Sequence, residues 1–249
     1  MRANYLDWKV RSSDGKGTIM GKNYLIGDTE TAGSLERPRV YDLGWVITNA
    51  KGEPLTRKSF IIKEIFEDQS LMNTAFYAEK LPQYYEGIKT GEWVVKTFAE
   101  ARATLLADMV QYNCTEFYAY NCKFDEKALN MTARALSNEW VESFLPRNVK
   151  YRDIWGYAQD CICATKSYVS WAVENSAFTP TGRISTNAEN VYRYLIKNVA
   201  FNERHTAADD AMIESYILHR ARHMPRKGSF DWKGPKLKAI NAIRAELGI

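Results

Sequence analysis

The sequence has little proline, little glycine and no long apolar run. Only 7 of its 249 residues are proline and 14 are glycine, whereas 45% are hydrophobic. This composition excludes collagen-like, low-complexity and disordered chains, which are rich in proline and glycine or poor in apolar residues. A chain of this length buries roughly 70–75% of its unfolded surface, so it needs neither disulfides nor a structural metal to fold. We therefore expect one large globular domain.

Cysteines are also few, and their spacing fits neither a disulfide framework nor a zinc site. Zinc-binding pairs are typically separated by two to four residues, whereas a single residue separates Cys161 from Cys163. The N-terminus lacks the apolar core of a signal peptide, and no apolar segment approaches the length of a membrane span. These absences predict reduced thiols in a soluble, cytoplasmic protein that has no membrane contact.

The net charge of +4 is small, but the basic residues are unevenly distributed. Residues 219–249 contain eight basic and only two acidic side chains. A basic end is typical of proteins with a polyanionic partner, although a solvated charged helix is the commoner explanation. We divide the chain into an N-terminal arm at 1–22, a main domain at 23–223 and a basic C-terminal segment at 224–249.

The first part of the main domain predicts three consecutive strands. The apolar run at 24–27 is typical of a buried central strand. Segments 40–48 and 55–62 are rich in β-forming residues, and the sequence Asn-Ala-Lys-Gly-Glu-Pro at 49–54 supplies the turn between them. We expect the second and third strands to form a hairpin.

Helices and strands alternate further along the chain. The pattern Thr97-x-x-Glu100 is a capping box that opens a helix, and Thr186-x-x-Glu189 is a second one. The other predicted elements are a strand at 116–120, a helix at 124–136, a short strand at 150–154, an irregular or partly helical insertion at 157–185 and a last helix at about 206–223. Three leading strands followed by α-β-α and further helices predict an α/β fold, with one mixed sheet flanked by helices.

Two carboxylates follow the first predicted strand directly, in Asp28-Thr29-Glu30, the only Asp-x-Glu in the chain. Buried carboxylates are costly unless they are paired, hydrogen-bonded or bound to a cation. Residues i and i+2 of a strand point to the same face, so the two carboxylates can share one ion. For an isolated Asp-x-Glu, a solvated loop or a helix cap is the commoner explanation.

A third carboxylate, Asp125, stands in a similar place. The sequence Asn-x-x-Phe-Asp at 121–125 follows the strand predicted at 116–120 and leads into a helix. Taken alone, Asp125 is better explained as an ordinary helix cap.

The last helix opens with His205-Thr-Ala-Ala-Asp209-Asp210. Acidic residues in a first turn usually favour the helix dipole. A functional interpretation makes His205 a base and one of the two aspartates a metal ligand. Periodicity favours Asp209, four residues after His205, if both residues lie on regular helix, and the argument lapses if His205 precedes the helix. Spacing alone leaves both aspartates open.

Together and in this order, the three patterns resemble the exonuclease motifs of the DnaQ-like, or DEDDh, superfamily. The matching segments are Asp-Thr-Glu-Thr-Ala-Gly at 28–33, Asn-x-x-Phe-Asp at 121–125 and His-x-Ala-x-x-Asp at 205–210. The resemblance spans residues 23–223 and fills all five catalytic positions. It implies a ribonuclease-H-like fold, which agrees with the order of strands and helices predicted above. The insertion at 157–185 and the basic C-terminal segment depart from the shortest members of the superfamily.

The resemblance also implies the metal ligands. Two divalent ions, Mg²⁺ or Mn²⁺, would be held by Asp28, Glu30, Asp125 and Asp210, because such hard cations prefer oxygen ligands. Two ions roughly 3.5–4 Å apart stabilise the attacking and departing oxygens of a phosphodiester. Asp28 would bridge the ions, Glu30 and Asp210 would favour the ion that holds the nucleophilic water, and Asp125 would support the other ion through water.

By the same resemblance, the ligand is Asp210 and not Asp209. His205 would take the proton of the water, which suits a side chain whose unperturbed pKa is about 6.5. Thr31 and Ala32 would lie beside the terminal sugar through their backbone. These residues complete the site that the resemblance implies.

The function predicted from the sequence is therefore a metal-dependent 3′→5′ exonuclease that releases nucleotides from DNA 3′ ends. The alternatives are a 3′→5′ exoribonuclease and, in a different class, a catalytically idle nucleic-acid-binding module. The expected partners are single-stranded or frayed nucleic acid 3′ ends. Because the chain has no room for a polymerase, a proofreading role would require a polymerase or another replication protein as partner.

Aromatic residues could supply a platform on which bases stack. For any one of them, a place in the core is the commoner explanation. The candidates are Tyr77, Tyr118, Tyr120, Trp155, Tyr168 and Trp171.

Overall fold

The computed structural model describes residues 22–137, 143–224, 244–246 and 248. The predicted arm at 1–22 therefore lies outside the described residues except for Lys22. The basic C-terminal segment is described only at Met224, at 244–246 and at Gly248. Among the described residues, no helix combines the length and the apolar character that crossing a membrane requires.

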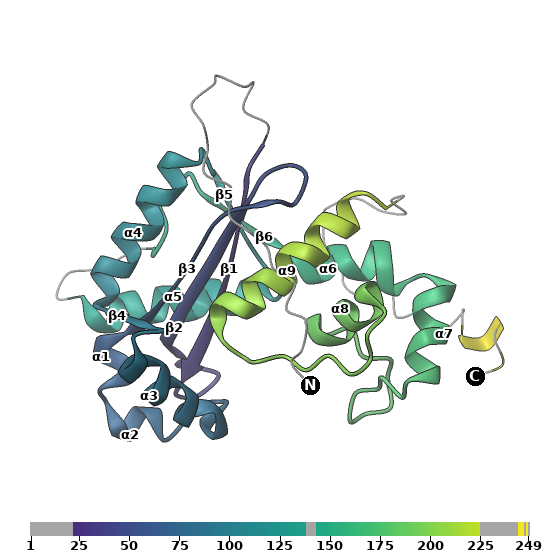
Figure 1. Cartoon of the computed structure of the whole chain (residues 1–249), viewed down its shortest axis with the longest axis horizontal. Coiled ribbons are helices and arrows are strands. Elements are labelled where there is room, and N and C mark those ends of the chain that lie inside the picture. Colours follow the sequence, from purple (N-terminus) through teal and green to yellow (C-terminus); the bar gives the residue numbers. More distant parts are fainter. Residues whose placement is uncertain (1–21, 138–142, 225–243, 247, 249) are drawn as a thin grey trace.

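A six-stranded mixed sheet, in the order β4-β3-β2-β1-β5-β6, crosses the described part of the chain (Figure 1). β2 runs antiparallel to both β1 and β3, whereas the pairs β1–β5, β5–β6 and β3–β4 are parallel. The α/β fold class with one mixed sheet is thus confirmed. The strands are β1 (Tyr24–Ala32), β2 (Arg39–Thr48), β3 (Pro54–Ile62), β4 (Val94–Lys96), β5 (Glu116–Ala119) and β6 (Lys150–Asp153).

Helices cover both faces of the sheet, and each face has its own apolar core. α4 and α5 pack on one face, while α9 crosses the other and is flanked by α6 and α8 (Figure 1). The described helices are α1 (Lys63–Phe66), α2 (Gln69–Met72), the 3₁₀ turn η1 (Ala78–Lys80), α3 (Leu81–Thr90), α4 (Phe98–Gln111), α5 (Cys122–Leu136), α6 (Ile154–Ala158), the π-helical turn η2 (Gln159–Cys163), α7 (Lys166–Glu174), α8 (Ala188–Ile196) and α9 (Ala207–Arg222).

The central strand β1 divides its side chains between the two cores. Leu25 belongs to the core under α4 and α5, and Ile26 belongs to the core under α9. Because side chains alternate along a strand, Asp28 and Glu30 follow Ile26 onto the α9 face. The prediction that β1 ends before this pair is wrong. Its pairing with β2 continues to Ala32 across an irregularity after Glu30, so the backbone remains hydrogen-bonded where the carboxylates project.

The start of α9 packs directly on β2. A Cβ atom on Gly44 would lie 2.3 Å from the backbone of Ala207 and Ala208, so only glycine permits this approach. The Asp42 carboxylate, also on β2, accepts a hydrogen bond from the Ala207 backbone N–H at 3.0 Å. These contacts fix the N-terminus of α9 over the centre of the sheet.

Most of the predicted elements have counterparts in the structure. The hairpin between β2 and β3 is confirmed, and Thr97 and Glu100 form the predicted capping box of α4. The capping box predicted at Thr186 is wrong, because Asn187 caps α8 by accepting a hydrogen bond from the Asn190 backbone N–H. The Thr186 hydroxyl instead accepts hydrogen bonds from Trp155 and Gln159.

The insertion predicted at 157–185 is partly helical, as expected. It contains the end of α6, all of η2 and α7, and an isolated bridge between Phe178 and Ile184. Together with α8 it forms much of the core on the α9 face.

Candidate active site

The three sequence motifs come from distant parts of the chain and meet at one place. β1 supplies Asp28 and Glu30, and the first turn of α5 supplies Asp125. The segment that enters α9 supplies the remaining two residues, His205 and Asp210. The pKa of Asp28 is raised well above its ordinary value, first by burial and then by the neighbouring carboxylates, which include Asp125, Asp210 and Glu30.

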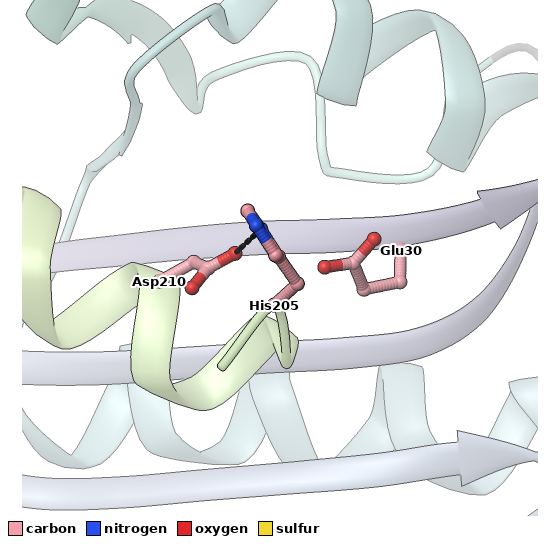
Figure 2. A group of neighbouring side chains, drawn as sticks. All are labelled: Glu30, His205 and Asp210. Carbon is pink, nitrogen blue, oxygen red and sulfur yellow. Dashed lines mark ion pairs between the residues drawn. The ribbon is translucent and has the colours of Figure 1, made fainter. Parts of the chain in front are cut away.

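Glu30, His205 and Asp210 form the tightest part of the site. One ligand atom of each lies within 4.8 Å of the others. Figure 2 shows the imidazole between the two carboxylates, with Asp210 Oδ2 3.9 Å from His205 Nδ1. This arrangement of two acids and an imidazole can hold a metal ion or pass a proton to and from a bound water.

Asp125 is tied to the strand that carries the first two carboxylates. The Thr29 hydroxyl donates a hydrogen bond to Asp125 Oδ1 at 2.9 Å. Thr29 points to the opposite face of β1 from Asp28 and Glu30, so it joins the first turn of α5 to the strand from that side. Burial raises the pKa of Asp125, although the Thr29 hydroxyl opposes this shift.

Without a bound cation, burying the carboxylates of the site in their charged form destabilises the folded protein. Burial raises the pKa of Glu30 and of Asp210, and repulsion between acidic neighbours raises both further. Asp210 Oδ1 is buried without a hydrogen-bond partner. A buried carboxylate oxygen without a donor loses its hydration and gains nothing in exchange. A divalent cation would supply the missing partner, so the donor set fits the expected metal.

His205 stands before the helix and not on it. α9 begins at Ala207 with Thr206 as its N-cap, and the backbone of His205 has a φ of +54°. Few residues other than glycine adopt this left-handed conformation, and it is often found at functional sites. The Tyr84 hydroxyl donates a hydrogen bond to the His205 carbonyl at 3.3 Å and helps to hold this conformation.

The imidazole of His205 is held by an aromatic ring. Tyr77 stacks on it with ring centroids 4.2 Å apart and an angle of 14° between the planes. Burial lowers the pKa of His205, so the ring is biased towards its neutral form. A neutral, oriented imidazole can accept a proton.

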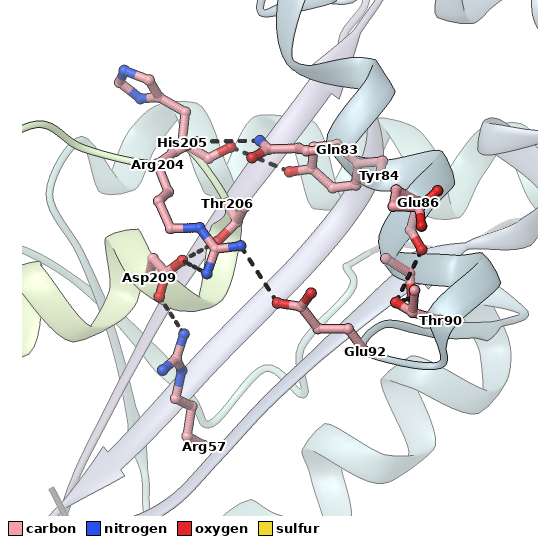
Figure 3. A network of polar contacts seen from close by, with 11 residues as sticks. Arg57, Gln83, Tyr84, Glu86, Thr90, Glu92, Arg204, His205, Thr206 and Asp209 are labelled. Atoms are coloured by element: carbon pink, nitrogen blue, oxygen red, sulfur yellow. Dashed lines mark hydrogen bonds and ion pairs between the residues drawn. The ribbon is translucent and has the colours of Figure 1, made fainter. Parts of the chain in front are cut away.

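The two adjacent aspartates of α9 have different surroundings. Asp209 forms ion pairs with Arg57 and Arg204, and it accepts a hydrogen bond from the Thr206 hydroxyl at 2.8 Å (Figure 3). Asp210 instead points to Glu30 and His205. Because successive helical residues point about 100° apart, only one aspartate can face the site, and Asp210 is the one that does.

A further buried carboxylate, Asp42, lies beside the site and has a full set of donors. It accepts hydrogen bonds from Ser59 at 2.6 Å and from Tyr84 at 2.9 Å, besides the one from Ala207. Asp42 pairs with Glu30 across β1 and β2. It therefore ties the start of α9 to the strand that bears the site.

Two acidic residues that the sequence motifs did not include also reach the site. Glu203 Oε2 lies 3.6 Å from His205 Nδ1, and Glu214 is the largest source of repulsion on Asp28. Glu214 lies one helical turn after Asp210 and accepts a hydrogen bond from the Tyr120 backbone N–H at 3.1 Å. The i, i+4 spacing on α9 could have revealed Glu214. Glu203 precedes the helix, and no periodic signal identifies it.

Some of the residues expected to contact substrate lie at the site, and others are buried in the core. The side chains of Thr31 and Ala32 are buried at the end of β1, which leaves their backbone for the contact that the resemblance implies. Among the candidate stacking residues, Tyr77 packs on His205 as described above. Three others, Tyr118, Tyr120 and Tyr168, are buried in the core.

Comparisons with known proteins support the fold. No protein-family model and no curated protein matches the chain. Among solved structures, E. coli exonuclease I in complex with a 5cy-dT13 oligonucleotide matches with a TM-score of 0.50 and 15% identity, covering 82% of this chain and 41% of that one. The chain thus spans about two fifths of the length of that protein. The match shows a shared fold, and the expected ribonuclease-H-like architecture is confirmed.

Two other structures match at slightly lower scores. Exonuclease I (apo) has 14% identity and a TM-score of 0.49, with 89% of this chain and 44% of that one covered. Cell-death related nuclease 4 (CRN-4) has 14% identity and a TM-score of 0.48, with 84% of this chain and 66% of that one covered.

Proposed function

We propose that this chain is a metal-dependent 3′→5′ exonuclease of the DnaQ-like type that releases nucleotides from DNA 3′ ends. The observation that carries the proposal is the unpaired Asp210 Oδ1, buried among carboxylates that raise one another's pKa. A protein keeps such an arrangement only where a ligand offsets its cost. The fold shared with E. coli exonuclease I is in keeping with this function.

Four residues would hold two divalent ions, Mg²⁺ or Mn²⁺. They are the carboxylates of Asp28, Glu30, Asp125 and Asp210. In the described part of the chain, the first three form no ion pair with a cationic side chain, and Asp210 is paired only with His205. When bound, the ions lower the pKa of a coordinated water and offset the charge of the phosphodiester. The oxygen-only donor set suits these hard cations better than zinc.

His205 would act as the general base. Its lowered pKa leaves the imidazole neutral near pH 7, where it can accept a proton from a water. Stacking on Tyr77 and the left-handed backbone hold the ring beside Asp210 and Glu30. The proximity of the ring to both carboxylates supports this role, because the attacking water would be held there.

The 3′ end of the strand would lie at the end of β1. Buried side chains at Thr31 and Ala32 leave backbone groups to meet the terminal sugar. The Thr31 carbonyl already accepts a hydrogen bond from the Phe76 backbone N–H at 3.2 Å, which fixes this stretch of backbone. A fixed backbone beside the metal ligands would favour attack at a terminal phosphodiester over an internal one.

The choice between DNA and RNA as substrate rests on a structural relative and not on the site residues. A related structure contains a dT13 oligonucleotide, which supports a single-stranded DNA substrate for this chain. An exoribonuclease would use the same carboxylates and base. A catalytically idle binding module is disfavoured, because it has no use for so much repulsion between buried acids.

Digestion of end-blocked strands tests the proposal. Single-stranded DNA and RNA of matched sequence, each with a blocked 3′ end, a blocked 5′ end or no block, are incubated with Mg²⁺ or Mn²⁺. We expect mononucleotide release from DNA, abolished by the 3′ block and indifferent to the 5′ block. Faster digestion of RNA would favour the exoribonuclease, and cleavage of a circular strand would contradict exonuclease action.

A further inference from the structure

A pocket of about 440 Å³ lies at the opposite end of α9 from the candidate active site. It is formed where α7, α8 and the last turn of α9 meet, and its volume is within the range of pockets that bind small ligands. The residues that give it its chemical character are Trp171, Tyr194, Lys197, Val199 and Arg220.

One wall of the pocket is aromatic and well supported. The rings of Trp171 and Tyr194 lie 5.6 Å apart at 63°. Both also pack on the buried ring of Tyr168, whose hydroxyl donates a hydrogen bond to the Ser185 carbonyl at 2.8 Å. Trp171 and Tyr194 are only partly buried, so part of each firmly held ring remains accessible for a base to stack on.

The rim of the pocket is basic. Lys197 and Arg220 are exposed, and neither forms an ion pair with a carboxylate in the described part of the chain. The described residues of the lining include no acidic one. Arg193 on α8, by contrast, is paired with Glu189. The rim is therefore complementary to an anion.

We infer that this pocket binds an internal nucleotide of the single strand whose 3′ end lies in the candidate active site. An aromatic wall with two unpaired cations matches a base and its flanking phosphates. The inference rests on the proposed function, because it takes the strand to continue from that site along α9.

The position of the pocket sets the length of strand required. Asp210 is in the first turn of α9 and Arg220 is in the last, ten residues later. At a rise of 1.5 Å per residue, they are about 15 Å apart along the helix. With roughly 3.4 Å between stacked nucleotides, the pocket would meet about the fifth nucleotide from the 3′ end. A trinucleotide is therefore too short to reach it.

Binding of oligonucleotides of two lengths tests the inference. Fluorescently labelled dT12 and dT3 are titrated with the full chain in excess chelator, so that no hydrolysis occurs. The test variant is Lys197→Asn with Arg220→Gln, where asparagine suits the left-handed backbone of residue 197. The control, Lys51→Gln with Lys89→Gln, removes the same charge from exposed sites elsewhere.

We expect the wild type to bind dT12 more tightly than dT3, and the test variant to lose most of this difference in affinity. Affinity of the test variant for dT12 should fall about tenfold, and the dependence of log K on log salt should become shallower by about 1.4, at roughly 0.7 for each lost contact. The control should keep both the affinity and the slope of the wild type. If the test variant keeps the wild-type affinity for dT12 and the wild-type salt slope, the inference is overturned. The same result is expected if the pocket binds an acidic peptide and not DNA.

Fluorescence of Trp171 gives a second, direct readout. Stacking of a base should change tryptophan emission of the wild type on addition of dT12 and not of dT3, and Trp171→Phe should lack this change. An identical change in Trp171→Phe would also overturn the inference. Because these measurements contain no metal, they are separate from mononucleotide release by the wild type, whose absence would reject the proposed function instead.

Discussion

The buried carboxylates at the centre of the molecule form two groups with opposite surroundings. Asp42 and Asp108 are paired with donors: Asp42 accepts three hydrogen bonds, and Asp108 accepts one from Trp45 at 2.9 Å and one from Lys58 at 2.7 Å. In the site, Asp28 and Asp210 face other acids, and Asp210 Oδ1 has no partner. The two groups are close together, since Asp42 pairs with Glu30 across β1 and β2.

The difference shows what each group does. A buried carboxylate with donors stabilises the fold, because the hydrogen bonds replace its lost hydration. A buried carboxylate among other acids destabilises the fold until a cation binds. This contrast supports a structural role for Asp42 and Asp108, and it supports the proposal that the acids around Asp210 hold a cation.

The largest expected effect separates Asp210 from its neighbour. Asp210→Asn removes a metal ligand and should lower the turnover number at least about a thousandfold, since metal ions contribute several kcal/mol to such reactions. Asp209→Asn weakens the ion pairs with Arg57 and Arg204 and leaves the candidate metal ligands in place, so its turnover should stay within about tenfold of the wild type. Single-turnover rates on dT12 measure both variants. An essential Asp209 with a dispensable Asp210 would overturn the assignment.

The next effect concerns the base. His205→Ala should lower the rate by about 10²–10⁴-fold, because a positioned base contributes that much. The residual rate should rise with pH as hydroxide replaces the missing base, whereas the wild type should level off above the lowered pKa of His205. Rates between pH 5 and 9 provide the comparison. A flat residual profile would argue against a general base.

A smaller effect contrasts the two groups in stability. Asp42→Asn disrupts hydrogen bonds from Ser59, Tyr84 and Ala207 and should lower the free energy of unfolding by about 1–3 kcal/mol. Asp28→Asn should leave stability in chelator unchanged or increased, because it relieves repulsion. Urea unfolding in excess chelator measures both. Equal destabilisation by the two substitutions would remove the distinction between the groups.

A further effect is the pH dependence of stability without metal. Burial raises the pKa of Asp125 to about 7 in the folded protein, from an ordinary value of 3.8. A raised carboxyl pKa gives stability that is complete at low pH and is lost as pH rises through the folded value. The melting temperature in chelator should therefore fall between about pH 4 and pH 7, and Mn²⁺ should counteract the fall. Stability that rises across this range would contradict the raised pKa.

The sequence predicted those parts of the molecule that have local signals. β1, β2, β3 and α9 were identified because apolar runs, turn residues and helical periodicity mark them. The candidate site residues were predicted from three short motifs, and the structure brings three of them, Glu30, His205 and Asp210, together. The order of the three motifs along the chain is what identifies these residues as members of one candidate site.

Other parts depend on contacts that the sequence does not display. The three residues of β4 and the four-residue helices α1 and α2 are too brief for a periodic pattern. Adjacent Thr186 and Asn187 could each cap α8, and the choice is made by Trp155 and Gln159, which engage the threonine hydroxyl. The stacking of Tyr77 on His205 joins segments 128 residues apart and arises only from tertiary packing.

Dependence of catalysis on metal is the most direct test of the distinction between the two groups of acids. Release of mononucleotides from 3′-labelled single-stranded DNA is followed in excess chelator, and then after Mg²⁺ or Mn²⁺ is added beyond the chelator. The account predicts no release in chelator, full release with either ion, and no recovery by either ion in Asp28→Asn. Full activity in excess chelator would contradict the account, because the buried acids would then have no cation to hold.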